Sequence, residues 1–510
     1  MKRKLAVLVV FTHLLASAFA AIIESPQKPI IAPGTVSASS ATVIWNKPEH
    51  YSNIIRYRVI LNRKHIATSE KCNYMFSDLL PSTPYTCTIQ AEDNEGKLSS
   101  NSATIQFTTK AKGKILDITS FGAKGDGTTL NTKAIQKAID ACPPRGTVQI
   151  PKGVFFCGAL FLKSHMTLQI LKGGILKGST NEADYLPFIN NRFEGWEMKT
   201  YASLLNAGVM NNKGGYSVEE LSIKGEGTIS GGGSTLAKAM IDKFGMRSRG
   251  RLICLLNCRN VEIQGLQIEN SPCWTIHYIY SKGITCHDLN IVSTAHNGDG
   301  LDPDSSDDSY IMNCSFSTGD DCIAIKSGKN PEGFTIARPT KNVRITDCNF
   351  TRGHGISIGS EMSGGVSDVF VRDCKAGALL HGMQIKGTKE RGGYVKNVTV
   401  MDCQLLQITI FSAVNYNNDG AAAPEPPTFE NFIFRNIDLS KAGLKEPVID
   451  INGFKDPAHH LRNVAFSNIV LPENVQVSVN DAEHVKFTDV KSVAGSKPKY
   501  AVGSSSDISY

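Results

Sequence analysis

The pattern of Val343-Arg-Ile-Thr-Asp-Cys-Asn-Phe350 recurs throughout the second half of this 510-residue chain. Apolar residues occupy most of its first, third, sixth and eighth positions, and the fifth is small or polar. Successive copies lie 23 to 34 residues apart, which is typical of a solenoid whose coils bury their apolar faces against one another. Further copies lie at 261–268, 284–291, 369–376, 398–405, 432–439 and 464–471, and 309–316 fits with a polar first residue.

Each copy supplies one or two short strands, and helical periodicity is nearly absent after residue 142. Short strands in such a repeat predict an all-β parallel β-helix, which we place at 114–510. Leucine-rich repeats share this period, but their leucine pattern and fixed asparagine are missing. One amphipathic helix is expected at 131–142, where it could act as a cap.

The sixth position of the pattern indicates what lies inside the coils. Because leucine and isoleucine share this position with four cysteines, we expect the cysteines to be small apolar residues of an interior stack. Disulfides between them are the alternative. The chain has 13 cysteines, so in an exported protein at least one is free or pairs with another chain. The residues at this position are Leu266, Leu289, Cys314, Cys348, Cys374, Cys403, Ile437 and Ile469.

The N-terminal region has a different pattern. Short strand-like runs alternate with turn signals between residues 26 and 110, which predicts a β-sandwich. Trp45 and Tyr85 are expected in its core, and Cys72 and Cys87 lie close enough in sequence to bridge. The stretch 85–99 resembles the end of a fibronectin type III domain. A short basic linker, 110–114, leads into the solenoid.

Residues 1–20 indicate export. Three basic residues precede an apolar stretch, and Ala18-Phe-Ala20 is typical of a signal cleavage site. A noncleaved anchor is the alternative. We therefore expect a secreted or periplasmic protein, whose formal charge falls from +7 to +4 when the leader is removed. This mild charge predicts no nucleic-acid partner. No run of 18 apolar residues follows the leader, so we expect no membrane span.

Acidic residues gather on two successive coils. Asn297-Gly-Asp299-Gly-Leu-Asp302 follows one copy of the repeat, and Gly319-Asp-Asp321 follows the next. A solenoid stacks equivalent positions, so these carboxylates can converge on one lateral face. Adjacent aspartates are costly to desolvate unless they are paired or used.

Basic residues extend this face. His354 and Asp320 lie at equal distances from the sixth position of their coils, so we expect them to be neighbours, with Lys386 further along. Carboxylates with a basic flank suit glycosidic hydrolysis, in which one carboxyl group protonates the leaving oxygen and another activates water. The alternatives are acids that cap turns or bind calcium, a structural His354 and a solvated Lys386.

These motifs resemble, in order and spacing, those of the polygalacturonase family of glycoside hydrolases. The resemblance covers about residues 115–475 and rests on 297–302, 319–326, Gly353-His-Gly355 and Ile385-Lys386, with 270–277 and 136–142 around them. It implies a right-handed parallel β-helix that hydrolyses α-1,4-galacturonosidic bonds of pectic polygalacturonate with inversion. It implies no cofactor and no metal.

The resemblance also implies roles for single residues. Asp320 resembles the general acid, and Asp299 with Asp321 resembles the pair that activates water. His354 resembles the histidine that tunes the acid, and Lys386 the cation that binds a galacturonate carboxylate. Asn297 and, in Val414-Asn-Tyr416, Tyr416 resemble substrate-contact residues.

Two positions depart from the family. Gly298 stands where the family commonly has threonine, and Gln384 stands where it has arginine. Arginine grips a carboxylate bidentately, and glutamine lacks the charge. The substrate carboxylate next to Gln384 is therefore held either at another subsite or by Lys386 with Lys389 or Arg391.

Several functions remain open at this point. We favour exo action, because a fibronectin-like domain before such a region resembles exo-acting bacterial members and segment 180–250 could close one end of a groove. An endo-acting enzyme and a hydrolase of substituted galacturonan are alternatives. A calcium-dependent lyase and a noncatalytic polysaccharide-binding β-helix are more distant ones.

Overall fold

The computed structural model describes residues 23–412, 420–443 and 447–510, so the predicted leader at 1–20 and Tyr416 lie outside the described residues. The chain divides into two compact units. The smaller holds Val43–Met75, Pro84–Thr108 and the residues up to Ile31. The larger holds Thr109–Tyr510 with two short segments, Ala32–Thr42 and Phe76–Thr83.

The N-terminal strands form a two-layered antiparallel sandwich. One sheet has the order β1-β2-β5 and the other β4-β3-β6-β7. Trp45 packs edge-on against Tyr57, and Tyr85 stacks on Phe107, each with ring centroids 5.5 Å apart. Both predicted core aromatics are therefore buried. The strands are β1 (Gln27–Ile31), β2 (Ala41–Asn46), β3 (Ile54–Leu61), β4 (Lys64–Ser69), β5 (Asn73–Phe76), β6 (Pro84–Asp93) and β7 (Ile105–Thr108).

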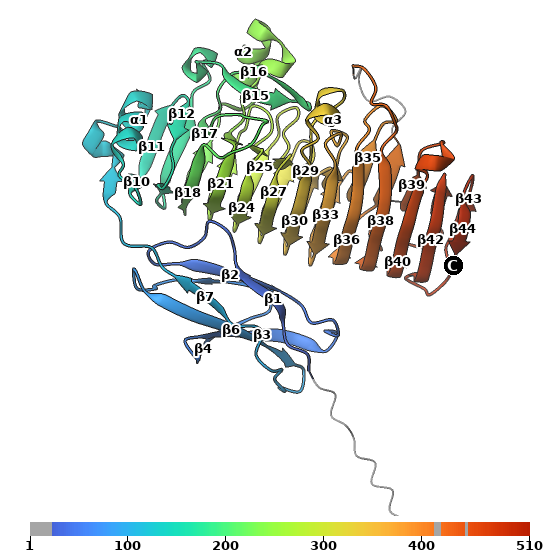
Figure 1. The fold of residues 1–510 in the computed structure, drawn as a ribbon. Coiled ribbons are helices and arrows are strands. Elements are labelled where there is room, and N and C mark those ends of the chain that lie inside the picture. The colour runs from blue at the N-terminus through green and yellow to red at the C-terminus, as the bar shows by residue number, and fades with distance from the viewer. Residues whose placement is uncertain (1–22, 413–419, 444–446) are drawn as a thin grey trace, which may run out of the picture. The chain divides into compact units, whose positions relative to one another are not determined.

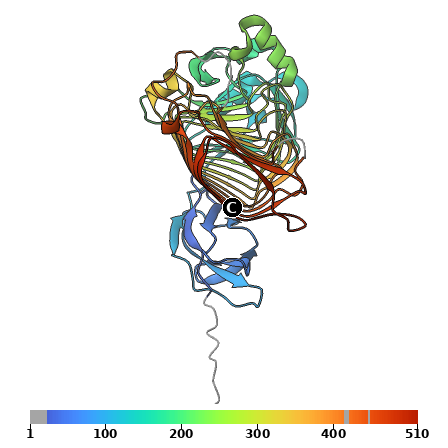
Figure 2. The ribbon, with the colours of Figure 1, turned by 90° about the vertical axis from the view of Figure 1, so that its right-hand side faces the viewer.

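The larger unit is a parallel β-helix, seen from the side in Figure 1 and along the stack of coils in Figure 2. Its narrower sheet carries the acidic motifs and is called the catalytic sheet below. In spatial order, this sheet holds β12 (Leu160–Leu162), β17 (Leu205–Gly208), β20 (Ile253–Leu256), β23 (Ile276–Ile279), β26 (Leu301–Asp304), β29 (Ile323–Ile325), β32 (Ile356–Ile358), β35 (Met383–Gly387), β37 (Ile408–Ser412), β39 (Ile449–Asn452), β41 (Gln476–Asn480) and β43 (Lys499–Val502).

The wider sheet contains the repeat itself. Most coils contribute two short strands to it, which merge into one long strand from β36 onward. Its strands are β8 (Ile115–Asp117), β9 (Asp126–Leu130), β10 (Thr147–Ile150), β11 (Gly153–Cys157), β13 (Thr167–Ile170), β14 (Gly174–Gly178), β18 (Val218–Gly225), β19 (Thr228–Ser230), β21 (Cys258–Gln264), β22 (Gln267–Glu269), β24 (Lys282–His287), β25 (Asn290–Ser293), β27 (Asp307–Met312), β28 (Ser315–Thr318), β30 (Thr340–Thr346), β31 (Asn349–Gly353), β33 (Val366–Arg372), β34 (Lys375–Leu379), β36 (Tyr394–Gln404), β38 (Thr428–Asp438), β40 (Leu461–Leu471), β42 (Ala482–Ser492) and β44 (Ser506–Ser509).

Helices and one hairpin complete the unit. The predicted cap is α1 (Thr132–Ala141), which buries Ile135, Ala138 and Ile139. The segment between β14 and β17 forms an antiparallel hairpin, β15 (Ile189–Phe193) with β16 (Trp196–Thr200), and α2 (Gly233–Phe244) follows later. Figure 1 shows α2 and this hairpin projecting beyond the coils. The shorter helices are α3 (Glu332–Ile336) and the 3₁₀ turns Ile118–Phe121, Glu182–Tyr185, Met246–Ser248 and Pro457–His459.

The backbone explains the repeat pattern. The fifth residue bends the chain, between two strands in the earlier coils and within one long strand from β36 onward, and its φ is positive, from 54° at Asp402 to 75° at Gly265. Glycine, asparagine and aspartate tolerate this conformation best. The sixth residue is buried in every copy, and all 13 cysteines of the chain are buried and none is in a disulfide. The interior stack is therefore present, and the bridge considered between Cys72 and Cys87 is not formed.

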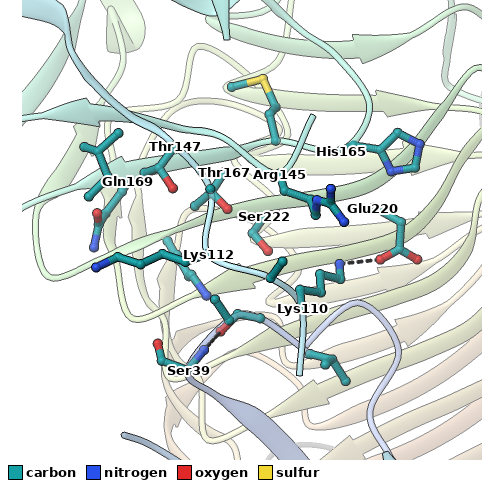
Figure 3. A pocket seen from close by; sticks show the side chains of 18 residues that line it. Ser39, Lys110, Lys112, Arg145, Thr147, His165, Thr167, Gln169, Glu220 and Ser222 are labelled. Atoms are coloured by element: carbon teal, nitrogen blue, oxygen red, sulfur yellow. Dashed lines mark hydrogen bonds and ion pairs between the residues drawn. The ribbon is translucent and has the colours of Figure 1, made fainter. Parts of the chain in front are cut away.

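One pocket lies away from the acidic motifs. It encloses about 390 Å³ beside the first strands of the β-helix, where Thr147, Thr167 and Ser222 are aligned (Figure 3). Glu220, the one carboxylate lining it, is paired with Lys110. A pocket with a single, neutralised acid does not supply the two carboxyl groups of glycosidic hydrolysis.

The longest described helix is α2, and none of the described helices is long and apolar enough to cross a membrane.

Candidate active site

Four successive coils bring the acidic motifs together on the catalytic sheet. Asp299 precedes β26 and Asp321 precedes β29, and Gly300 N–H donates to the Asp321 carbonyl at 3.0 Å. Ile323 lies opposite Ile356, so the backbone aligns His354 with Asp321. The sequence offset aligned His354 with Asp320 instead. The backbone also confirms this neighbour, since His354 N–H donates to the Asp320 carbonyl at 2.9 Å.

The side chains make the expected contact as well. His354 Nδ1 lies 3.0 Å from Asp320 Oδ1 and 3.6 Å from Asp321 Oδ1. These hydrogen bonds to Asp320 and Asp321 raise the pKa of His354 to about 10. The imidazole is therefore a cation at neutral pH and spans both adjacent aspartates.

Asp321 is buried but held in its charged form. Ser357 Oγ donates to its Oδ1 at 2.7 Å, and Lys386 Nζ lies 3.7 Å from its Oδ2. Although burial acts to raise it, Lys386, His354 and Ser357 hold the pKa of Asp321 below its usual range. This carboxylate can accept a proton from a bound water.

Asp299 occupies the equivalent place on the preceding coil, but its surroundings shift its pKa in the opposite direction. Burial and the neighbouring Asp302 carboxylate raise its pKa well above the usual range. Burial also raises the pKa of Asp302 to about 8, with Lys326 opposing the shift. Like charges this close do not ionise together. The pair therefore keeps a proton while Asp321 stays ionised.

One buried ammonium, Lys326, joins these acids. Its Nζ lies 3.6 Å from a carboxylate oxygen of Asp299, of Asp302 and of Glu361, and 4.6 Å from the ring centroid of Trp274. The sequence motif contained Lys326 and Asp302, but their pairing could not be read from it. Glu361 and Ser357 carried no signal, since their relevance depends on which coils stack.

The Asn297 side chain is half-buried and is held by a hydrogen bond. Arg249, almost fully buried, donates to Asn297 Oδ1 and to the His296 carbonyl, both at 2.8 Å. Its guanidinium also lies over the ring of Phe193 in β15. The hairpin is thus connected, through Arg249, to the turn that precedes Asp299.

The hairpin itself is anchored across the coils. Arg192 donates to Asp304 Oδ1 of β26 at 2.6 Å, and Trp196 Nε1 donates to the Asn330 carbonyl at 2.9 Å. A Cβ atom at Gly195, the hairpin tip, would meet Lys329 Cβ at 2.3 Å. This close approach requires glycine and fixes the tip against the turn after β29.

The structure narrows the question raised by Gln384. Gln384 is buried in β35. Arg391 is fully buried and donates to the Ser360 carbonyl at 2.7 Å and to Asn330 Oδ1 at 2.8 Å, while Lys389 extends into solvent. Arg391 is thus engaged with Ser360 and Asn330, and the cation that holds this substrate carboxylate stays a prediction. Tyr416 lies outside the described residues.

Asp320, Asp321 and His354 could also group around a metal, since one ligand atom from each lies within 4.8 Å of the others. The His354 nitrogen is already bonded to Asp320. A cationic imidazole carries a proton on both nitrogens and cannot ligate a metal without losing one. The geometry therefore favours an acid–base pair at this place.

The family model for glycosyl hydrolases family 28 matches residues 147–471, and that for the fibronectin type III domain matches 24–108. The chain belongs to glycosyl hydrolases family 28. Its relatives include the exo-poly-alpha-D-galacturonosidase of Dickeya chrysanthemi, 28% identical over 94% of this chain and 93% of the relative. These matches confirm the family that the motifs resembled.

Solved structures of exopolygalacturonases share the fold. The family 28 exopolygalacturonase of Yersinia enterocolitica aligns with a TM-score of 0.85 and 26% identity, over 95% of this chain and 98% of the other. An exopolygalacturonase from Thermotoga maritima aligns with a TM-score of 0.62 and 25% identity, over 76% and 91%.

Proposed function

We propose that this family 28 glycoside hydrolase cleaves α-1,4-galacturonosidic bonds of polygalacturonate, with inversion and from a chain end. The observation that carries the proposal is the row formed by Asp320, Asp321, His354 and Lys386. It combines an accessible carboxyl group, an ionised buried carboxylate and two cations on one sheet face. An anionic sugar polymer needs such cations, and its hydrolysis needs the two carboxyl groups.

The exposure of the three aspartates supports their roles. The Asp320 side chain is 26% exposed, against 4% for Asp299 and 6% for Asp321. Asp320 is thus the group that reaches the leaving oxygen and protonates it. Asp321 takes a proton from the water that attacks the anomeric carbon from the opposite side. Asp299 retains its proton and orients that water.

Exo action is supported by two observations. Relatives spanning nearly the whole chain are named as exo-acting enzymes. In this chain Arg192 and Trp196 hold the β15–β16 hairpin beside the catalytic turns. A hairpin held next to the reacting groups can close one end of the binding site, which suits binding of a chain end. Endo action and a substituted galacturonan remain the competing proposals.

The leader at 1–20 supports export, so we also propose a secreted or periplasmic location. Fractionation of a culture that expresses the full chain tests it. The mature protein should start after Ala20 by N-terminal sequencing. An intact N-terminus in the membrane fraction would support the anchor instead.

One experiment tests the function. De-esterified polygalacturonate is digested in the presence of a chelator and followed by proton NMR. We expect saturated products, an initial β anomer and early release of short products from chain ends. Ultraviolet absorbance of unsaturated ends would show a lyase, and an initial α anomer would overturn the aspartate roles. Binding without turnover would show a noncatalytic polysaccharide-binding protein.

A further inference from the structure

The row of catalytic groups continues one coil beyond His354. Ile356 lies opposite Met383, so the backbone of His381 is aligned with that of His354. Ile356 N–H donates to the Gly382 carbonyl at 2.9 Å, and Leu380 N–H donates to the Gly353 carbonyl at 2.8 Å. The two imidazoles meet edge to face, with ring centroids 5.5 Å apart.

The two cations nearest this position also hold the catalytic carboxylates. His354 is bonded to Asp320, and Lys386 lies next to Asp321. Gln384, the buried polar neighbour on β35, carries no charge. Because each sugar of a uronate chain carries a carboxylate, a further donor beside these cations suits the sugar next to the reacting bond. His381 is half-buried and next in the row.

We propose that His381 binds a galacturonate carboxylate one coil beyond His354, and that it does so as a proton-dependent cation. This inference rests on the proposed substrate, a uronate polymer. It makes His381 a substrate-contact residue that sets affinity, while the carboxyl chemistry stays with the aspartates.

The surroundings of His381 support the proton dependence. Burial lowers the pKa of the free imidazole, a hydrogen bond with Gln407 opposes this, and the charges of His354 and Lys386 lower it further. Asp321 is the acid that acts on it in the other direction. A bound carboxylate favours the imidazolium and raises its pKa. The gain in affinity is therefore full below the pKa of the free form and is lost as pH rises through that of the bound form.

The test compares KM for oligogalacturonate at about pH 5 and about pH 7.5, on either side of the ordinary histidine range. We expect the KM of the unchanged protein to rise between them. His381→Asn should raise KM about tenfold at the lower pH, the scale of one charge-assisted hydrogen bond, with kcat little changed. His381→Lys should keep KM low at both values, because its charge does not titrate there.

His165→Asn, at an exposed histidine on the turn before β13, is the matched control and should change neither parameter. Equal KM values for His381→Asn and the unchanged protein at the lower pH would overturn the inference while leaving the hydrolase proposal intact. A fall in kcat alone, unrelieved in His381→Lys, would also overturn it and indicate a structural role. If the unchanged protein does not hydrolyse the substrate at all, the proposed function fails first.

Discussion

Asp299 and Asp321 show how strongly position decides the behaviour of one residue type. Both precede a strand of the catalytic sheet and both are buried, yet their pKa values move in opposite directions. Asp321 faces Lys386, His354 and Ser357, whereas Asp299 faces another carboxylate. The sequence motifs identify both residues as functional. They do not reveal which one keeps a proton, since that depends on side chains from two further coils and on how the coils stack.

Asp320→Asn should lower kcat by about 100- to 10,000-fold, because the proton donor is removed while the shape is kept. Asp402→Asn is a suitable control. It changes a carboxyl group to an amide at a turn position where the next coil, at Asn436, already has asparagine. Initial rates on oligogalacturonate measure both variants. Similar losses in the two would contradict the role of Asp320.

The His354 imidazolium should make stability depend on pH. Its pKa is raised to about 10, so its contribution is full below the ordinary value of 6.5 and is lost as pH rises through about 10. The difference in Tm between the unchanged protein and His354→Gln should therefore shrink between about pH 6 and pH 10. A constant difference over this range would mean that the imidazole is neutral in the folded protein.

At the scale of the element, the fifth position of the repeat is a backbone requirement. Asn436 has a φ of 55°, donates to Asp402 Oδ1 at 2.9 Å and accepts from Asn468 Nδ2 at 2.9 Å. The pattern could be seen in the sequence because this strain recurs in every coil. The hairpin β15–β16 could not, since it is a single insertion with no counterpart to compare.

Asn436→Ala should destabilise the β-helix by about 1–2 kcal/mol, the cost of a left-handed conformation for a residue with a Cβ atom. Asn436→Gly should cost less, since glycine adopts the same backbone without strain and loses only the side-chain hydrogen bonds. Urea unfolding of the two variants measures the difference. Equal losses would assign the effect to the hydrogen bonds alone.

The cysteine stack is a second feature of the element. Because leucine and isoleucine occupy the same place in other coils, thiols serve there as apolar filling. Titration of thiols under denaturing, nonreducing conditions should find close to the 13 present in the chain. A count of one or none would show bridges and refute the stack.

At the scale of the whole molecule, the fold follows from repetition and the site follows from stacking. The period of the sequence predicts a solenoid, and the solenoid places Asp299, Asp321, His354 and His381 in one row. Arg249 and the hairpin that supports it come from a separate part of the chain. No local pattern links them to the row, because their contact is made only when the coils are assembled.

The buried thiols also affect how each molecule folds and whether it can refold after unfolding. Inside the packed coils they are shielded, and burial raises the pKa of Cys348 and Cys374 well above the usual range, so oxidants find no thiolate. In an unfolded chain the same sulfurs are exposed and free to form mispaired bridges within minutes to hours. During maturation, formation of the coils therefore competes with oxidation of the exposed thiols. Unfolding by heat in air should therefore be irreversible, and a reductant should restore refolding.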